Sequence, residues 1–178
     1  MEDPERKRWK DEAGDELVVD YFPYPPDLPP IEGSELAAFF RSANERSGST
    51  LVEATTLDVE GIQAVRIISK TRNEPMGMIY GGSIIVPLAR RSWVIKVICV
   101  ERGITGMRET VLLEKLLSEG LDPPTVMAKV KDQVDDPLLD ADWPDHPLTK
   151  VRRTLDQVVA SIVLAPEVGD EQHLAPGW

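Results

Sequence analysis

Apolar and polar residues alternate in short runs between residues 51 and 100, and turn-forming residues separate these runs. Alternation with a period of two is typical of β-strands, because successive side chains point to opposite faces of a sheet. In the last run, apolar residues occupy both faces, which indicates a strand in the middle of a sheet that is covered on both sides. The pattern predicts four strands, at residues 51–57, 62–70, 78–86 and 92–100.

The N-terminal part of the chain has a different pattern. Apolar residues at positions 9 and 17–22 flank the polar run 11–15, which predicts a β-hairpin. The segment that follows, residues 23–30, holds five prolines in eight positions. Because proline has no amide hydrogen, this segment is expected to be an extended connector on the domain surface. The alternative is a proline-rich ligand for an SH3-type groove.

Elsewhere apolar residues recur every three or four positions, which is typical of amphipathic helices. Ser34 is expected to cap a helix over residues 35–46. Three more helices are predicted, at residues 107–118, 125–133 and 147–164. The order of hairpin, helix, four strands and helices indicates an α+β fold with an antiparallel sheet covered by helices. We expect a single domain over residues 1–165 and a flexible C-terminal tail over residues 166–178.

The composition limits the functions that are open to the chain. Its 178 residues are 42% hydrophobic, which is enough for a sizeable core. A net charge of −11 and a pI near 4.7 argue against nucleic-acid binding, which needs a basic face. The charged first residues are unlike a signal peptide, and no run approaches the ~18 apolar residues of a membrane helix. The single cysteine, Cys99, cannot form an internal disulfide, so the cytoplasm is the expected location.

Residues that usually carry catalysis are scarce. Besides Cys99, which lies in an apolar strand, the chain has only two histidines, His146 and His173. Asp145 and His146 would be half of a hydrolytic triad, but no Gly-x-Ser-x-Gly elbow supplies a serine, so His146 is expected to cap a helix. Six aspartates between residues 132 and 145 lack the spacing of a calcium loop, which favours a solvated acidic connector. The sequence assigns no catalytic, cofactor-binding or metal-ligating residue.

Residues 101–109 form the most polar segment next to regular structure, where a strand passes into a helix. Free amide groups at a helix N-terminus favour anions, and the two arginines here could bind a carboxylate or phosphate in a bidentate manner. The strand around Gly81 is a second candidate, because methionine and tyrosine suit an adaptable binding face. The alternatives are a capped turn held by a Glu–Arg pair, and ordinary core packing. The candidate binding residues are Glu101, Arg102, Arg108, Glu109, Met78 and Tyr80.

Known proteins are similar to this chain in four segments, residues 75–87, 92–97, 101–109 and 146–152. Together the segments resemble a family of uncharacterised bacterial proteins with no assigned activity, over most of residues 9–160. This resemblance implies no functional residues, since none are established for that family. A weaker resemblance, at the level of the fold, is to the DcrB/PsbP-like α/β/α sandwiches. Some of those proteins act as chaperones for transmembrane segments of secreted effectors, and others are accessory proteins of larger assemblies.

The lack of catalytic motifs and the acidic composition favour binding over catalysis. We predict a cytoplasmic, non-enzymatic protein-binding factor with a chaperone, immunity-type or adaptor role and no cofactor. Another protein is the expected partner; neither nucleic acid nor a membrane span is expected. The alternative is a small carboxylate-dependent hydrolase or transferase, or a small-anion-binding protein, that uses residues 101–109. The sequence leaves the identity of the partner and the oligomeric state open.

Overall fold

Six strands form one sheet in the computed structural model, which describes residues 6–29, 33–74 and 77–164. The strands are β1 (Arg6–Lys10), β2 (Glu16–Phe22), β3 (Ser49–Val59), β4 (Ile62–Arg72), β5 (Met78–Pro87) and β6 (Ser92–Val100). They are antiparallel and lie in the order β1-β2-β6-β5-β4-β3. The predicted α+β fold with an antiparallel sheet is confirmed. The tail predicted over residues 166–178 lies outside the described residues.

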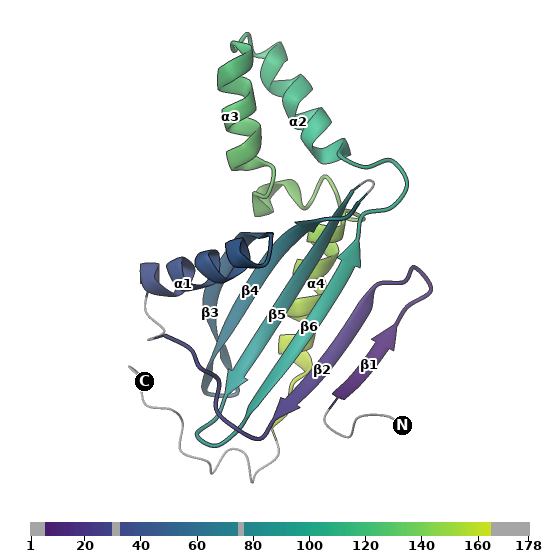
Figure 1. The fold of residues 1–178 in the computed structure, drawn as a ribbon. Helices are drawn as coiled ribbons and strands as arrows, with labels where there is room; N and C mark the ends of the chain where they lie inside the picture. Colours follow the sequence, from purple (N-terminus) through teal and green to yellow (C-terminus); the bar gives the residue numbers. More distant parts are fainter. Residues whose placement is uncertain (1–5, 30–32, 75–76, 165–178) are drawn as a thin grey trace.

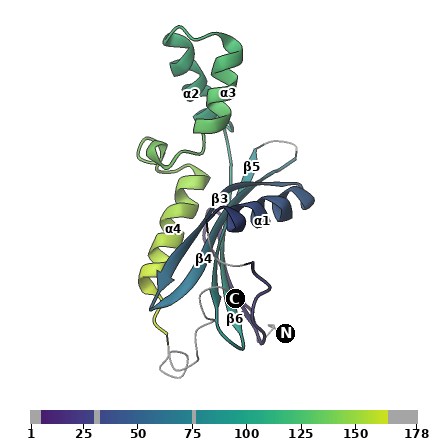
Figure 2. The same ribbon diagram turned by 90° about the vertical axis from the view of Figure 1, so that its left-hand side faces the viewer.

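Two helices cover opposite faces of this sheet, as Figures 1 and 2 show. Helix α1 (Gly33–Arg46) packs on β3 and β4, and α4 (Pro147–Ser161) packs on β5 and β6. Helices α2 (Met107–Ser118) and α3 (Pro123–Gln133) form a hairpin that projects beyond one end of the sheet. A short 3-10 helix, η1 (Pro137–Leu139), lies between this hairpin and α4.

Several boundaries differ from the sequence prediction for local reasons. Strands β3 and β4 extend to a two-residue turn because Glu60 and Gly61 both adopt positive φ values, of 53° and 84°. Helix α3 starts at Pro123, since proline is tolerated in a first helical turn and Asp122 accepts a hydrogen bond from the Thr125 N–H at 3.3 Å. Helix α4 ends at Ser161, three residues early. The predicted Ser34 cap concerns a side chain outside the described ones.

The main core lies between α4 and the sheet, and a glycine sets how closely they approach. A Cβ atom on Gly82 of β5 would lie 2.5 Å from Val151 Cγ1 and 2.6 Å from Leu155 Cδ1. Only a residue without a side chain allows the helix to rest directly on the strand at this point. The fully buried side chains around this contact include Ala64, Ile68, Ile84, Leu88, Leu148, Val151 and Leu155.

The opposite face is covered less completely than the sequence predicted. Helix α1 buries Leu36 and Phe40 against Val65, at the β3–β4 side of the sheet. On β6 the side chains that point to this face, among them Val94 and Ile98, are only half-buried. Strand β6 is therefore central, as predicted, but α4 covers one of its faces much better than α1 covers the other.

The proline-rich segment is described over residues 23–29 and has no regular secondary structure. It lies against the domain, because Leu28 packs on the α1 core and the Tyr24 carbonyl accepts a hydrogen bond from Ser92 Oγ at 3.2 Å. These contacts agree with the predicted connector.

Candidate functional site

Glu101 links the end of β6 to two neighbouring elements. Its Oε2 accepts a hydrogen bond from the Met78 N–H at 3.0 Å, and its Oε1 accepts one from the Gly106 N–H at 2.8 Å. Gly106 is the N-cap of α2 and has a φ of 71°, which favours glycine. Both carboxylate oxygens thus hold the loop between β6 and α2 in place, and this is the capped-turn alternative rather than a reactive carboxylate.

The two arginines of the predicted anion site have different partners. Arg102 is exposed and donates to Asp15 Oδ1 at 2.7 Å, at the turn between β1 and β2. The Arg108 side chain is fully buried and donates to Asp140 Oδ1 at 3.1 Å and to the Asp136 carbonyl at 2.7 Å. Each guanidinium is already engaged, so the predicted bidentate capture of an external anion by these residues stays a prediction without support in the geometry.

Tyr80 and Met78 belong to the core side of β5, so for Tyr80 the alternative of ordinary core packing applies rather than an adaptable binding face. Its side chain is 1% exposed, and its ring lies 5.3 Å from the ring of His146. Burial and the nearby carboxylate of Glu109 raise the pKa of the Tyr80 hydroxyl above its usual value. Met78 is half-buried against the main core. The physical reason is the alternation of β5, which points both residues toward α4.

His146 caps α4, as predicted. Its Nδ1 accepts a hydrogen bond from the Leu148 N–H at 3.2 Å, and its Nε2 is buried without a partner among the described residues. Because Nδ1 accepts, the neutral ring carries its proton on Nε2. Burial and the neighbouring Arg108 lower the pKa of His146 to about 4. The ring is therefore a neutral helix cap at physiological pH, and its geometry does not resemble that of a catalytic triad.

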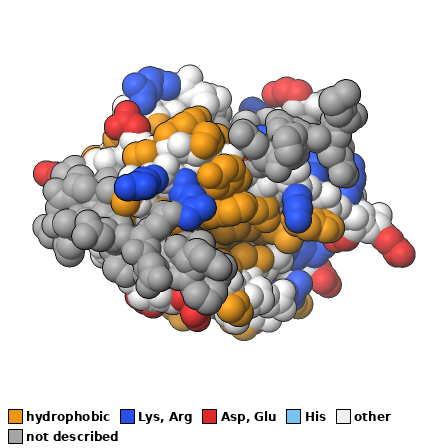
Figure 3. All heavy atoms as spheres, turned by 90° about the horizontal axis from the view of Figure 1, so that it is seen from below, with side chains coloured by type: hydrophobic (Ala, Val, Ile, Leu, Met, Phe, Trp, Pro, Cys, Tyr) orange, Lys and Arg blue, Asp and Glu red, His pale blue; other side chains and the backbone are white. Residues whose placement is uncertain are grey.

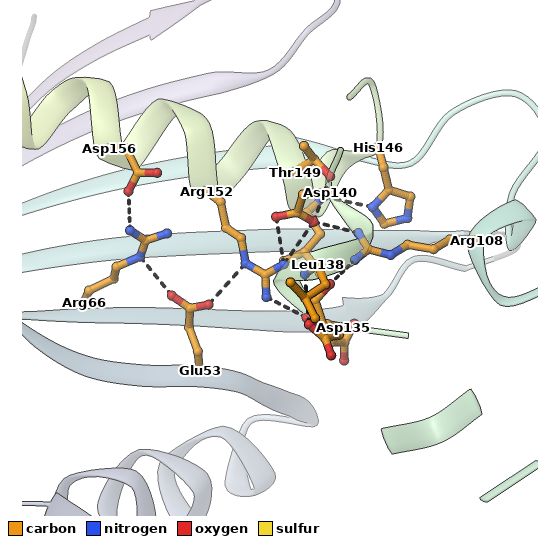
Figure 4. Close-up of polar contacts among 12 residues, drawn as sticks. Glu53, Arg66, Arg108, Asp135, Leu138, Asp140, His146, Thr149, Arg152 and Asp156 are labelled. Carbon is orange, nitrogen blue, oxygen red and sulfur yellow. Dashed lines mark hydrogen bonds and ion pairs between the residues drawn. The ribbon is translucent and has the colours of Figure 1, made fainter. Parts of the chain in front are cut away.

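A chain of alternating charges runs along one flank of α4 (Figure 4). Glu53 accepts from Arg152 Nε at 3.2 Å and forms an ion pair with Arg66 Nε at 2.9 Å, and Arg66 also pairs with Asp156. Arg152 continues the chain through Asp140 Oδ2 at 3.0 Å. From Asp140 the chain reaches the buried Arg108, so five elements and loops are connected by charge pairs.

The acidic loop before α4 is therefore only partly the solvated connector that the sequence predicted. Asp140 accepts from Arg108, Thr149 and Arg152, and Asp135 pairs with Lys70 of β4. The prediction missed these pairs because their cations come from distant segments. One signal was present, since Arg152 falls within the apolar stripe of α4, between Leu148 and Leu155, where a charge must find a partner.

On the other flank of α4 the side chains leave an open groove. Three hollows of about 360, 370 and 330 Å³ follow one another along the helix. Neighbouring hollows share lining residues, since Trp9 and Leu17 line the first two and Lys150 lines the second and third. We call this feature the α4 groove. Its floor is formed by β1, β2, β6 and the end of β5, and one wall is formed by α4 from Pro147 to Ser161.

The first hollow of the α4 groove is almost wholly apolar. Trp9 is 50% exposed and lies on the same sheet face as Leu17 and Val19, which are half-buried against the main core. Figure 3 shows hydrophobic side chains gathered in a hollow at this end of the molecule, with Lys and Arg side chains around it. The lining residues of the first hollow are Trp9, Leu17, Val19, Val86, Trp93, Ile95, Val158, Ser161, Ile162, Val163 and Leu164.

The third hollow, at the polar end of the α4 groove, contains two of the predicted site residues. Glu101 and Arg102 line it together with Trp143, His146 and Lys150. Arg108, Glu109, Met78 and Tyr80 do not line any of the three hollows. The sequence prediction thus reached one end of the groove. It missed the apolar end, whose residues come from β1, β2, β5, β6 and the C-terminal part of α4 with the residues that follow it.

Other chemistry is sparse among the described residues. No group of three or more His, Cys, Asp or Glu side chains in the described ranges is arranged to hold a metal ion. Burial raises the pKa of the Cys99 thiol to about 12, so Cys99 is a small buried apolar residue rather than a nucleophile. None of the described helices has the length and apolar character needed to span a bilayer.

Comparisons with known proteins give no family. No protein-family model matches the chain, and no curated protein sequence matches it. A Pseudomonas aeruginosa protein of unknown function, PA94, is similar in structure, with a TM-score of 0.42 and 14% identity over 69% of this chain and 85% of that one. The Ran-binding protein Mog1p of Saccharomyces cerevisiae has a TM-score of 0.36 and 10% identity over 75% of this chain and 78% of that one. Neither similarity is close enough to define a function, and the predicted PsbP-like and bacterial-family resemblances stay predictions.

Proposed function

We propose that this protein binds a partner protein in the α4 groove. The observation that carries the proposal is the half-exposed Trp9 at the edge of an apolar hollow that also contains Trp93. Tryptophan is enriched among the residues that dominate binding energy, because it buries a large apolar area with few rotatable bonds. An apolar centre with charged side chains around it is the usual arrangement of such an interface.

The polar regions of the molecule support binding over catalysis. The carboxylate of Glu101 is held by two backbone N–H groups, and the Arg108 guanidinium is held by Asp140 and Asp136. These contacts stabilise the fold and engage the Glu101 carboxylate and the Arg108 guanidinium, so neither group is free to act on a substrate. A chaperone, immunity-type or adaptor role in the cytoplasm is the form of protein binding that we propose.

Site-specific photo-crosslinking tests the proposal directly. A photoreactive phenylalanine analogue is placed at position 9, in the groove, and in a second protein at Arg41, an exposed site on α1 on the opposite side of the sheet. After irradiation in cell extract, we expect a discrete crosslinked protein from position 9 that is absent from position 41. The same products at equal yield from both positions, or none from position 9, would contradict the proposal.

Two substitutions of exposed aromatic residues by alanine measure how much the groove contributes to the affinity for the partner. Trp9→Ala should weaken binding of the crosslinked partner about 30-fold, which corresponds to the 2 kcal/mol typical of a central aromatic residue. Tyr24→Ala is the matched control, because Tyr24 is 57% exposed but does not line the groove. Titration calorimetry with the purified partner gives both values. Equal weakening by the two substitutions would place the interface elsewhere.

A further inference from the structure

We infer that the occupant of the α4 groove is an amphipathic helix of a partner protein, with acidic residues beside its apolar stripe. This inference rests on the proposed function and specifies the chemistry of the partner. Three features of the groove lead to it: its dimensions, the state of the backbone in its floor, and the charges at its apolar end.

The groove has room for one helix next to α4. Helix α4 rests on β5 and β6, and β1 and β2 are the next two strands across the sheet. Two strands span about 10 Å, which is the diameter of a helix. The wall formed by Pro147–Ser161 is about 22 Å long, or four helical turns. A second helix would lie beside α4 and cover Trp9, Leu17 and Val19.

The floor of the groove offers side chains but no free backbone groups. Strand β2 pairs with β1 over Glu16–Asp20 and with β6 over Glu16–Phe22. Between Glu16 and Asp20, where β2 forms the floor, its N–H and C=O groups are therefore used within the sheet. A chain segment buried on this floor must satisfy its own backbone hydrogen bonds, and a helix does so within a single segment. An extended segment could pair only with the outer edge of β1, outside the groove.

The charges at the apolar end favour an acidic occupant. No charged residue lines the first hollow. Lys7 lies directly opposite Val19 in the β1–β2 register, so both point to the groove side of the sheet. Arg90 is exposed in the turn between β5 and β6, whose flanking residues Val86 and Trp93 line the hollow. Among the described residues, no carboxylate forms an ion pair with Lys7 or Arg90. Acidic side chains beside an apolar stripe would lie near Lys7, on the groove face, and near the turn that carries Arg90.

Synthetic peptides test the inference on the full-length protein. Two sixteen-residue helical peptides share one apolar stripe, and carry either glutamate or lysine on its two sides. By titration calorimetry, we expect the glutamate peptide to bind at least tenfold more tightly than the lysine peptide. Proline in the centre of the glutamate peptide should reduce affinity at least tenfold, because it breaks the helix. The double variant Lys7→Glu/Arg90→Glu should reverse the preference between the two peptides.

The peptide experiments and the crosslinking experiment test the inference and the proposed function separately. Equal binding of the two peptides, no binding of either, or no effect of proline overturns the acidic-helix inference. The proposed function still stands in those cases if the crosslink at position 9 is found, and falls if that crosslink is absent. A chain that ends at Leu164 provides one more control. If this truncation alone raises peptide affinity tenfold, residues 165–178 of the chain are the occupant and the inference is overturned.

Discussion

The two flanks of α4 are built in opposite ways. Toward β3 and β4, Arg152 and Asp156 meet Glu53 and Arg66 in a continuous row of ion pairs. Toward β1 and β2, the helix presents Lys150, Thr154 and Val158 to the α4 groove, which is open. The same helix is therefore tied to one half of the sheet by ion pairs and leaves the other half accessible.

The two flanks of α4 therefore have different roles: one contributes to the stability of the fold, and the other is available for binding. Buried charges cost desolvation energy unless each is paired, so the buried centre of the ionic flank depends on its partners. The groove flank keeps apolar area in contact with water, which lowers the stability of the free protein and leaves that area available for a partner. Substitutions on the ionic flank should change folding, whereas those in the groove should change binding.

The largest effect is expected from removing the central cation of the ionic flank. The side chain of Arg152 is 8% exposed and pairs with both Glu53 and Asp140. Arg152→Met should lower the free energy of unfolding by about 3 kcal/mol, since two carboxylates lose a buried partner. Urea denaturation gives the value. The neighbouring Arg153→Met, at an exposed position, should cost less than about 0.5 kcal/mol. Equal losses would mean that the ion pairs do not hold this flank.

The next largest loss of stability is expected at Gly82, where α4 rests directly on β5. Gly82→Ala places a methyl group 2.5 Å from Val151, so the helix must shift, at a cost of about 2 kcal/mol. Gly81→Ala is the matched control on the same strand, because its nearest neighbour would be Ser69 Oγ at 3.9 Å. The difference between the two midpoints of urea unfolding is the test. If Gly81→Ala costs as much, the close approach of α4 is not what the glycine provides.

Acid sensitivity should arise where the two flanks meet, at His146. Its pKa is lowered to about 4 in the folded protein, against 6.5 as the ordinary value. Between these values the unfolded chain binds the proton and the folded chain does not, so stability falls as pH decreases from about 6.5 toward 4. The slope is at most about 1.4 kcal/mol per pH unit, and roughly 1 kcal/mol is expected between pH 6.5 and 5.5.

A histidine-free cap separates this effect from the titration of carboxylates. His146→Asn keeps a good N-cap but cannot be protonated, and it should flatten the decrease in stability over this pH interval. His173→Asn, which removes the other histidine, should leave the decrease unchanged. Urea denaturation at pH 6.5, 6.0 and 5.5 gives the free energy of unfolding of the unsubstituted protein and of the two variants. An unchanged slope in His146→Asn would assign the acid sensitivity to other groups.

The ease of prediction also differs between the two flanks. The strands, the helices and the cap at His146 follow from local patterns of apolar residues, prolines and glycines, and the structure confirms them. Local patterns also single out Glu101, which was predicted as a binding residue and which in the structure holds a loop through two backbone N–H groups. The ionic flank depends on pairs such as Glu53 with Arg152, which are 99 positions apart. Such contacts depend on the order of strands in the sheet, and a single sequence does not contain that order.

The α4 groove was harder still to predict, because it consists of apolar side chains of the sheet that no helix covers. In the sequence, Trp93 has the alternation of an ordinary core residue, whereas Trp9 stands alone among charged residues. Only the sheet order, which places β2 beside β6 and β1 at the edge, shows that α4 is too narrow to reach Trp9. The sequence predicts the apolar positions, and the topology decides which of them stay exposed.

The smallest effect is expected at the outer end of the ionic flank. Asp156 pairs with Arg66, but its side chain is 66% exposed, whereas that of Glu53 is 21% exposed. Water and salt screen the exposed pair, so Asp156→Asn should change the free energy of unfolding by less than about 0.5 kcal/mol. Glu53→Gln, at the inner end, should cost several times more, because two arginines lose their shared carboxylate. Equal costs at the two ends would show that the chain of charges acts as one unit, and the stability of this flank would then be a property of the whole network rather than of its buried centre.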